Sequence, residues 1–141
     1  MLIKDVMTPN PYTIDPDRTV LEALLMMYDH DIRRLPVIEK GKLIGIISDR
    51  DIKQTMGRPS LSDKQRSGES DELRFAVRDV MTHNLITVRQ DDDLKEAIEL
   101  IVENKISGLP VVDRDGNLVG VVSTIDLLRY CLDLVEQIRG K

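Results

Sequence analysis

The sequence has few aromatic residues, and their scarcity limits how its core can be built. Among 141 residues there are three Tyr, one Phe and no Trp, together 3% of the chain. Apolar residues nevertheless make up 41%, a normal share for a globular protein. The core must therefore consist mainly of Ile, Leu, Val and Met. The length suits one ordinary domain or two very small ones.

Three further absences exclude whole classes of protein. The single cysteine, Cys131, cannot form a disulfide within the chain, so the sequence fits a reducing compartment. With 20 basic and 25 acidic residues the net charge is −5, without the basic excess typical of duplex nucleic-acid binders. There is no signal-peptide pattern and no apolar run near the ~20 residues of a membrane-spanning helix. We expect a soluble, cytoplasmic protein that binds neither nucleic acid nor membrane.

The chain instead contains a long internal repeat. Its opening IKDVMT at 3–8 returns as VRDVMT at 77–82. Two longer stretches repeat in the same order: IRRLPVIEK (32–40) with ISGLPVVDR (106–114), then GKLIGIISDRDI (41–52) with GNLVGVVSTIDL (116–127). A unit of about 55–60 residues written twice indicates an internal duplication. Two copies are few for an open solenoid, so we expect a closed, pseudo-twofold pair.

Each copy is expected to begin with a short strand and a helix. The strands are YTI (12–14) and LITV (85–88), which are rich in β-forming residues. The first helix is expected over 19–30. Its start carries a capping-box spacing in both copies: Thr19-x-x-Glu22 and Asp93-x-x-Glu96.

A β-hairpin and a second helix should complete each copy. The hairpin turns are expected at Lys40-Gly41 and at Arg114-Asp115-Gly116, where Gly can supply a positive φ. Helices should follow at 48–56 and 123–138. The longer one has an apolar stripe of helical period that places Cys131 in the core: Leu127, Leu128, Cys131, Leu134, Val135 and Ile138.

The predicted organisation is repeat 1 at 1–56, a linker at 57–74 and repeat 2 at 75–141. The linker is rich in Ser, Gly and charge and nearly free of apolar residues, which is typical of a mobile spacer. A helical turn is expected near 70–75. The initial Met and short C-terminal tail favour a complete small protein, with a fragment of a larger enzyme as the alternative.

Three motifs, each present twice in order and register, resemble those of the cystathionine-β-synthase (CBS) domain: DVMT, LPVV(D) and GhhSxxDh, where h is apolar. The two copies resemble a tandem CBS pair, or Bateman module. The resemblance implies an α/β (α+β) fold of two β-α-β-β-α repeats packed as a pseudo-twofold module with two clefts. It also implies regulation rather than catalysis, adenosine-containing ligands such as AMP, ADP, ATP or S-adenosylmethionine, and association as a homodimer.

The candidate site centres on two matching junctions of strand and helix, Ser48 with Asp51 and Ser123 with Asp126. A Ser three residues before an acid ordinarily caps a helix. A carboxylate can also accept hydrogen bonds from a ribose diol, while a hydroxyl and helix N-terminal N–H groups can hold a phosphate. Within this duplicated pattern we favour ligand contact over capping alone.

Further candidate residues surround these junctions. Hydroxyl groups come from Thr13 and Thr87, for which strand propensity is the alternative role, and from Thr124. An apolar pocket for the base would use Ile14, Val88, Pro36 and Pro110, which core packing explains equally well. In the related family the DVMT stretch lines the cleft, so second-rank contacts are Met7, Thr8, Met81 and Thr82.

The two copies differ where charge matters. Arg33 and Arg34 precede LPV in the first copy, and Ser107 and Gly108 precede it in the second. The resemblance places these residues crosswise: Arg33 and Arg34 at the cleft of Asp126, and Ser107 and Gly108 with Arg50 at the cleft of Asp51. The alternative for the arginines is surface ion pairs worth ~0–1 kcal/mol each.

Other kinds of site find no support. His30, His83 and Cys131 lack metal-ligand spacing, the phosphate-loop patterns are missing, and no nucleophile–base pair is evident. We therefore predict no enzyme, no catalytic residue, no metal site and no catalytic cofactor.

The leading hypothesis is a free-standing adenine-nucleotide sensor, binding its ligand with or without magnesium and signalling to an unknown protein partner. The alternatives are a structural dimerisation module with vestigial clefts and an S-adenosylmethionine-class sensor. The three arginines favour phosphates over a cationic sulfonium.

Overall fold

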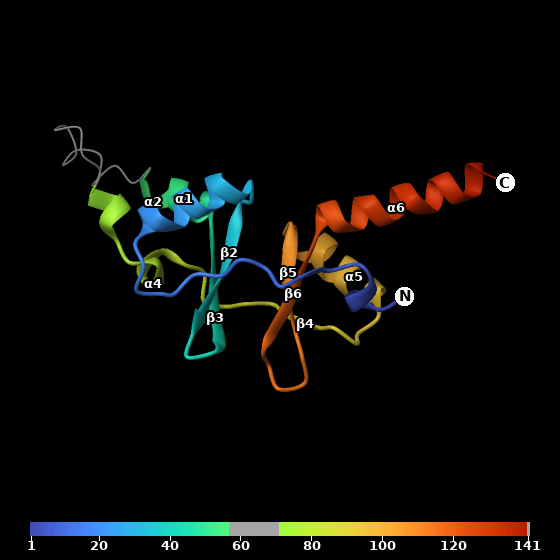
Figure 1. Cartoon of the computed structure of the whole chain (residues 1–141), viewed down its shortest axis with the longest axis horizontal. Coiled ribbons are helices and arrows are strands. Elements are labelled where there is room, and N and C mark those ends of the chain that lie inside the picture. Colours follow the sequence, from blue (N-terminus) through green and yellow to red (C-terminus); the bar gives the residue numbers. More distant parts are fainter. Residues whose placement is uncertain (57–70, 141) are drawn as a thin grey trace. The chain divides into compact units, whose positions relative to one another are not determined.

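The structure is a computed structural model that describes residues 1–56 and 71–140 (Figure 1). The chain divides into two compact units. Unit 1 consists of Met1–Pro11 and Ile86–Lys141, and unit 2 of Tyr12–Leu85. Neither unit is one continuous sequence repeat, because the DVMT segments (residues 3–8 and 77–82) pack with the other repeat's hairpin. Each unit is described below by itself.

Unit 2 is built on the β2–β3 hairpin. Its elements are α1 (Val20–His30), β2 (Arg34–Glu39), β3 (Lys42–Ser48), α2 (Asp49–Met56), η2 (Asp71–Arg74) and α4 (Val77–Val80). The hairpin turns at Lys40 and Gly41 with φ of 51° and 80°, the left-handed pair that a tight turn with the native strand twist needs. Single bridges join Val37 to Ile14 and Ile46 to Thr82. The predicted hairpin, and a helical turn near 70–75, are confirmed.

Unit 1 contains a four-stranded sheet in the order β1-β6-β5-β4. Its elements are η1 (Ile3–Asp5), β1 (Thr8–Pro9), β4 (Val88–Arg89), α5 (Leu94–Asn104), β5 (Gly108–Val112), β6 (Leu118–Ser123) and α6 (Thr124–Arg139). Strand β4 is parallel to β5 and the other pairs are antiparallel. Strand β1 comes from the N-terminal segment, although its partner β6 ends only at Ser123. The second predicted hairpin is also confirmed.

The first strands are shorter than predicted. Over 12–14 only Ile14 pairs, its N–H donating to Pro36 and its carbonyl accepting from Ile38, both at 3.0 Å. In unit 1 pairing begins only at Val88. The N–H groups of alternate residues face the same neighbouring strand, so Pro36 stands where a donor is needed and has none. Pro110 occupies the matching place in β5.

The helix starts carry the predicted caps, but not complete capping boxes. The Thr19 hydroxyl accepts from the N–H of Glu22 at 3.1 Å, and the Asp93 carboxylate accepts from the N–H of Lys95 at 2.9 Å. The Glu22 carboxylate pairs instead with Arg18 at 2.9 Å. The single side-chain caps are therefore confirmed as helix-start signals.

Each unit has its own core, centred on the LPV sequence of its hairpin and completed by the DVMT segment. Unit 2 buries Ile14, Val20, Ala23, Met27, Leu35, Val37, Ile47, Ile52, Val77 and Met81. Unit 1 buries Ile3, Val88, Leu94, Ala97, Ile101, Leu109, Val111 and Val122. Ile3 and Val77, which match in the repeat, are both fully buried. The segments are thus integral parts of the cores.

The last helix extends past its own core. Leu127 and Tyr130 pack against the core of unit 1, but every residue from Cys131 to Gly140 is exposed. The prediction that Cys131 is a core residue is therefore wrong in the single chain. Helical period identified the apolar stripe correctly, but it could not show that the core ends after about two turns of α6.

Candidate functional site

In unit 2 the candidate site lies where β3 ends and α2 begins. Oδ2 of Asp51 accepts hydrogen bonds from the backbone N–H and the hydroxyl of Ser48, both at 2.9 Å. The N–H of Asp51 donates back to the Ser48 hydroxyl at 3.1 Å. This is a reciprocal capping box, and it fixes the carboxylate in one orientation.

Unit 1 repeats this geometry at the junction of β6 and α6. Oδ2 of Asp126 accepts from the N–H of Ser123 at 2.8 Å and from its hydroxyl at 3.0 Å. The N–H of Asp126 returns a bond to the hydroxyl at 3.2 Å. Asp126 is only 8% exposed, whereas Asp51 is half-buried.

A second hydroxyl reaches each acid from the DVMT segment. Thr82 donates to Oδ1 of Asp51 at 3.2 Å, and Thr8 donates to Oδ1 of Asp126 at 2.9 Å. Both threonines were ranked second from sequence, and their contact with the acid was not foreseen. The clue was that both copies of the DVMT motif keep this Thr.

A glycine in each hairpin allows the segment to come this close. A Cβ on Gly45 would lie 2.6 Å from Sδ of Met81 and 2.9 Å from the carbonyl of Thr82. A Cβ on Gly120 would lie 2.6 Å from Sδ of Met7 and 2.8 Å from the carbonyl of Thr8. Real Cβ atoms do not approach that closely, so the threonine position depends on glycine in both units.

The strand preceding each junction brings further predicted residues to it. Arg34 stands opposite Ser48 in the β2–β3 register, and the carbonyl of Arg33 accepts from the N–H of Asp49 at 2.9 Å. Burial lowers the pKa of Arg34, while Asp49 raises it and Arg33 lowers it. A guanidinium remains charged at neutral pH despite such a shift, so this end of unit 2 is cationic.

The matching end of unit 1 has no such charge. Gly108 stands opposite Ser123, and the carbonyl of Ser107 accepts from both the N–H and the hydroxyl of Thr124, at 2.9 and 3.3 Å. Small neutral residues therefore occupy the positions of Arg33 and Arg34.

The remaining predicted residues fall into two classes. Ile14, Val88, Pro36 and Pro110 are buried, which the core-packing alternative explains. Thr13, Thr87 and Arg50 are exposed. Their exposed position allows contact with a ligand, so their role in the site stays a prediction.

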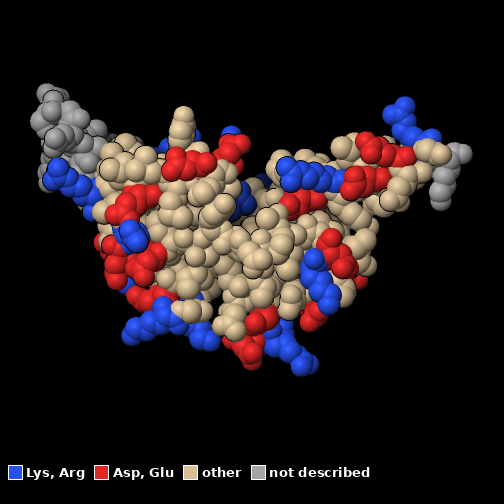
Figure 2. Space-filling view, in the orientation of Figure 1, with Lys and Arg blue, Asp and Glu red and all other residues tan. Residues whose placement is uncertain are grey.

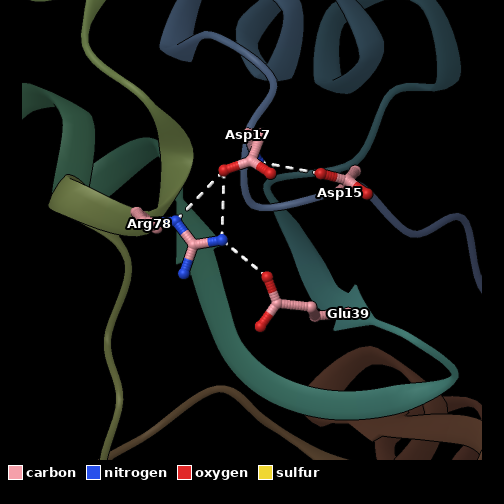
Figure 3. Close-up of polar contacts among 4 residues, drawn as sticks. All are labelled: Asp15, Asp17, Glu39 and Arg78. Atoms are coloured by element: carbon pink, nitrogen blue, oxygen red, sulfur yellow. Dashed lines mark hydrogen bonds and ion pairs between the residues drawn. The ribbon is translucent and has the colours of Figure 1, made fainter.

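An ion-pair network anchors one DVMT segment, and sequence reasoning missed it (Figure 3). Arg78 donates to Oε2 of Glu39 at 2.6 Å and to Oδ1 of Asp17 at 3.0 and 3.1 Å. The bond to Glu39, and then that to Asp17, raise the pKa of Arg78. In unit 1 the matching Lys4 has the ion pair with Asp91, at 3.1 Å.

Three further observations concern surface charge, metal ligands and membrane-spanning helices. Figure 2 shows acidic and basic side chains intermixed on the face that it draws. Among residues 1–56 and 71–140, no three His, Cys, Asp or Glu side chains gather as metal ligands would. Over the same residues no helix combines the length and the apolar character needed to traverse a bilayer.

The chain is similar to several curated proteins. A CBS domain-containing protein of Dictyostelium discoideum, DDB_G0289609, is 33% identical over 98% of this chain and 96% of its own length. Protein MJ1225 of Methanocaldococcus jannaschii is 31% identical over 89% of this chain and 47% of its own. The inosine-5′-monophosphate dehydrogenase of that organism is 35% identical over 92% and 22%. The chain thus spans about half or a fifth of the latter two.

Solved structures with the same fold include two complexes with ligands. CBSX2 in complex with AMP has a TM-score of 0.77 and 30% identity, covering 94% of this chain and 97% of CBSX2. The CBS domain pair of protein MJ0100, in complex with 5′-methylthioadenosine and S-adenosyl-L-methionine, has a TM-score of 0.74 and 29% identity, covering 92% and 94%.

The repeat seen in the sequence coincides with the family matches. The family model for the CBS domain matches residues 3–57 and again residues 77–133. These two matches include both Ser-x-x-Asp junctions and both DVMT segments. The chain belongs to the CBS domain family and carries two CBS domains in tandem.

Proposed function

We propose that this chain is a regulatory module that binds an adenosine-containing nucleotide at Asp51 and at Asp126 and reports it to a protein partner. The observation that carries the proposal is the pair of oriented carboxylates, each with Oδ2 saturated by a serine and Oδ1 turned to the DVMT threonine. Two related structures are complexes, one with AMP and the other with 5′-methylthioadenosine and S-adenosyl-L-methionine. All of these ligands contain adenosine.

The residues around the acids supply the chemistry that such a ligand needs. A carboxylate accepts hydrogen bonds from ribose hydroxyls. A charged guanidinium suits a phosphate, because charge-assisted bonds are roughly twice as strong as neutral ones. Arg33, Arg34 and Arg50 thus favour AMP, ADP or ATP over S-adenosylmethionine, whose sulfonium is cationic.

Signalling would follow from linkage rather than from chemistry on the ligand. A ligand shifts a conformational equilibrium only by the difference between its affinities for the two states. The module therefore needs a shape that the nucleotide favours and that a partner recognises. We propose no catalytic residue and no metal or cofactor beyond the nucleotide, with or without magnesium.

Calorimetry with AMP, ADP, ATP and S-adenosylmethionine tests this function. Asp51→Ala and Asp126→Ala should each abolish or weaken one binding event by about 10- to 150-fold, the worth of a hydrogen bond to a charged group. Asp115→Ala, in the exposed hairpin turn, is the matched control. If neither site variant changes the affinity for any of the four ligands, the acids are helix caps only and the proposal is wrong.

Titrations with adenosine, AMP and ATP test the phosphate role of Arg34. Arg34→Ala should weaken nucleotide binding, increasingly from adenosine to AMP to ATP. The effect should shrink as salt is added, since screening weakens charge pairing. Equal weakening of adenosine and ATP would remove the phosphate assignment.

We also propose that two copies associate through α6. Along its exposed part the apolar positions follow a heptad-like spacing: Ile125, Leu128, Leu132 and Val135 are 50–58% exposed. In an antiparallel pairing centred near Leu132, Arg129 would face Glu136 of the partner subunit, and the converse pair would form by symmetry. This charge pairing favours a second copy of the chain as the partner that covers α6. It also supports the alternative of a structural dimerisation module.

Light scattering at micromolar concentration measures this association. The wild type should have the mass of a dimer, and Leu132→Glu should have that of a monomer. Val102→Glu, on the exposed face of α5, is the control for an added charge and should leave the mass unchanged. A monomeric wild type would contradict the dimer without affecting the nucleotide proposal.

A further inference from the structure

We propose that Thr8 and Thr82 set the ribose selectivity of the two sites, by occupying the acceptor position that a second ribose hydroxyl would use. The inference rests on the proposed function and assigns a role to residues outside the Ser-x-x-Asp motif. Thr8 acts on Asp126 within unit 1, and Thr82 acts on Asp51 within unit 2.

The argument starts from the hydrogen-bonding capacity of a carboxylate. Its two oxygens together offer about four acceptor positions. At Asp51 the N–H and the hydroxyl of Ser48 use both positions on Oδ2, and Thr82 uses one on Oδ1. Asp126 is occupied in the same way by Ser123 and Thr8. One acceptor position per acid is left for a ligand.

A ribose diol brings two donors to this one position. While the threonine keeps its bond, the acid can therefore accept only one of the two hydroxyls. Accepting both requires the threonine hydroxyl to leave Oδ1. The threonine thus competes with the second hydroxyl. The acid alone therefore does not determine how strongly a site prefers a ligand with both ribose hydroxyls.

The surrounding contacts hold the threonine backbone while leaving its side chain able to turn. The N–H of Thr82 donates to the carbonyl of Ile46 at 2.8 Å, and its carbonyl accepts from the N–H of Ile46 at 3.1 Å. Thr8 pairs with Val121 at the start of the β1–β6 ladder. Both threonines are exposed residues. Competition therefore costs a side-chain rotation and does not require the DVMT segment to detach.

The two sites should differ in how strongly the threonine competes. Thr8 is 2.9 Å from Asp126, within the usual range for a hydroxyl donor, whereas Thr82 is 3.2 Å from Asp51, beyond it. The shorter bond also ends on the more buried acid. Removing the hydroxyl should therefore change ribose binding more at Asp126 than at Asp51.

The test compares AMP with 2′-deoxy-AMP, with one site silenced at a time. Thr8→Val is made in the Asp51→Ala background and Thr82→Val in the Asp126→Ala background, because valine keeps the branched shape and lacks the hydroxyl. Calorimetry should show AMP binding about two- to tenfold tighter in each valine variant, with 2′-deoxy-AMP nearly unchanged. Thr8→Ser and Thr82→Ser, which retain a hydroxyl, should keep the selectivity of their backgrounds.

The outcomes separate this inference from the function beneath it. If AMP binds neither background, or binding ignores both aspartates, the proposed function fails and this inference fails with it. If binding needs the aspartates but valine weakens AMP and 2′-deoxy-AMP equally, the threonines only position the acid. An unchanged preference for AMP over 2′-deoxy-AMP also refutes the inference, while the function stands. Thermal unfolding without ligand checks that each variant is folded.

Discussion

Unit 1 and unit 2 hold their acids in nearly the same hydrogen-bonding arrangement, yet they surround them with different charge. Corresponding bonds from serine to aspartate differ by 0.1 Å at most. Around them, unit 2 has Arg33 and Arg34 where unit 1 has Ser107 and Gly108. The duplication has thus kept the part that orients the carboxylate and varied the part that can interact with a ligand's charge.

The attachment of the DVMT segments shows a second difference between the units. Matching backbone bonds hold both: the N–H of Val77 donates to Arg18 at 2.8 Å, and that of Ile3 to Asp92 at 3.0 Å. Arg78 then adds bonds to two acids, whereas Lys4 has an ion pair with one. The two DVMT segments thus share their backbone hydrogen bonds and their burial, and they differ in their surface ion pairs.

The largest expected effects test whether the two cores are energetically equivalent. Leu35 and Leu109 occupy matching places and are 0% and 1% exposed. Leu35→Ala and Leu109→Ala should each lower the free energy of unfolding by about 2–5 kcal/mol, from lost burial and the cavity left behind. Urea unfolding measures both. A cost below about 1 kcal/mol in one unit only would show that its core is loosely packed and would break the equivalence.

The glycines beneath the DVMT segments should give the next largest effects. Gly45→Ala and Gly120→Ala should each cost about 1–3 kcal/mol, because the new methyl group would overlap the Met and Thr of the segment. Urea unfolding is again the measurement. Gly140→Ala, where a Cβ would be 3.3 Å from the nearest atom, is the control and should cost much less. If neither substitution lowers the free energy of unfolding, the DVMT segments do not pack against Gly45 and Gly120 as described.

Part of this fold could be predicted from the sequence, and part could not. Hairpins, helices and serine–aspartate caps depend on neighbouring residues, so motif and periodicity predicted them. The pairing of each DVMT segment could not be predicted in this way, because the two segments are nearly identical and suit either hairpin. Local patterns also did not reveal that Pro36 would shorten a ladder, or that the core would end before Cys131.

A smaller effect should distinguish the two DVMT anchors. Arg78→Ala should lower Tm more than Lys4→Ala, because it removes bonds to two acids. These groups are solvent-exposed, so both effects should decrease at 1 M salt. Thermal unfolding at low and high salt measures this, with Lys95→Ala, which removes an exposed pair with Glu99, as the control. Equal losses for Arg78 and Lys4 would show that the additional acid contributes nothing.

The smallest expected effect concerns Asp113, which matches Glu39 in the repeat but has a different role. Its carboxylate accepts from the N–H groups of Asn117 and Asp115, and these contacts, that with Asn117 foremost, lower its pKa. A lowered pKa gives stability that is present above the unfolded value of about 3.9 and is lost as the pH falls through the lower folded value.

Asp113→Ala should therefore lower Tm slightly at pH 7 and have a smaller effect at pH 2. Thermal unfolding at both pH values measures this difference. Asp115→Ala, in the same turn, serves as the control. A deficit that does not change with pH would assign the effect to the shape of the turn rather than to the carboxylate.

The exchanged DVMT segments also set an order of events on the ribosome. Unit 2 is complete in sequence at Leu85, whereas unit 1 needs both Met1–Pro11 and strand β6, which ends at Ser123. At a synthesis rate of about 5–20 residues per second, the first segment waits roughly 5–25 s for its partner strand. Between the synthesis of Ser48 and that of Val77, strand β3 has been made, while the DVMT segment that pairs with it has yet to be made. The segment at 3–8, which matches it in the repeat, is therefore available to β3 before the native partner is.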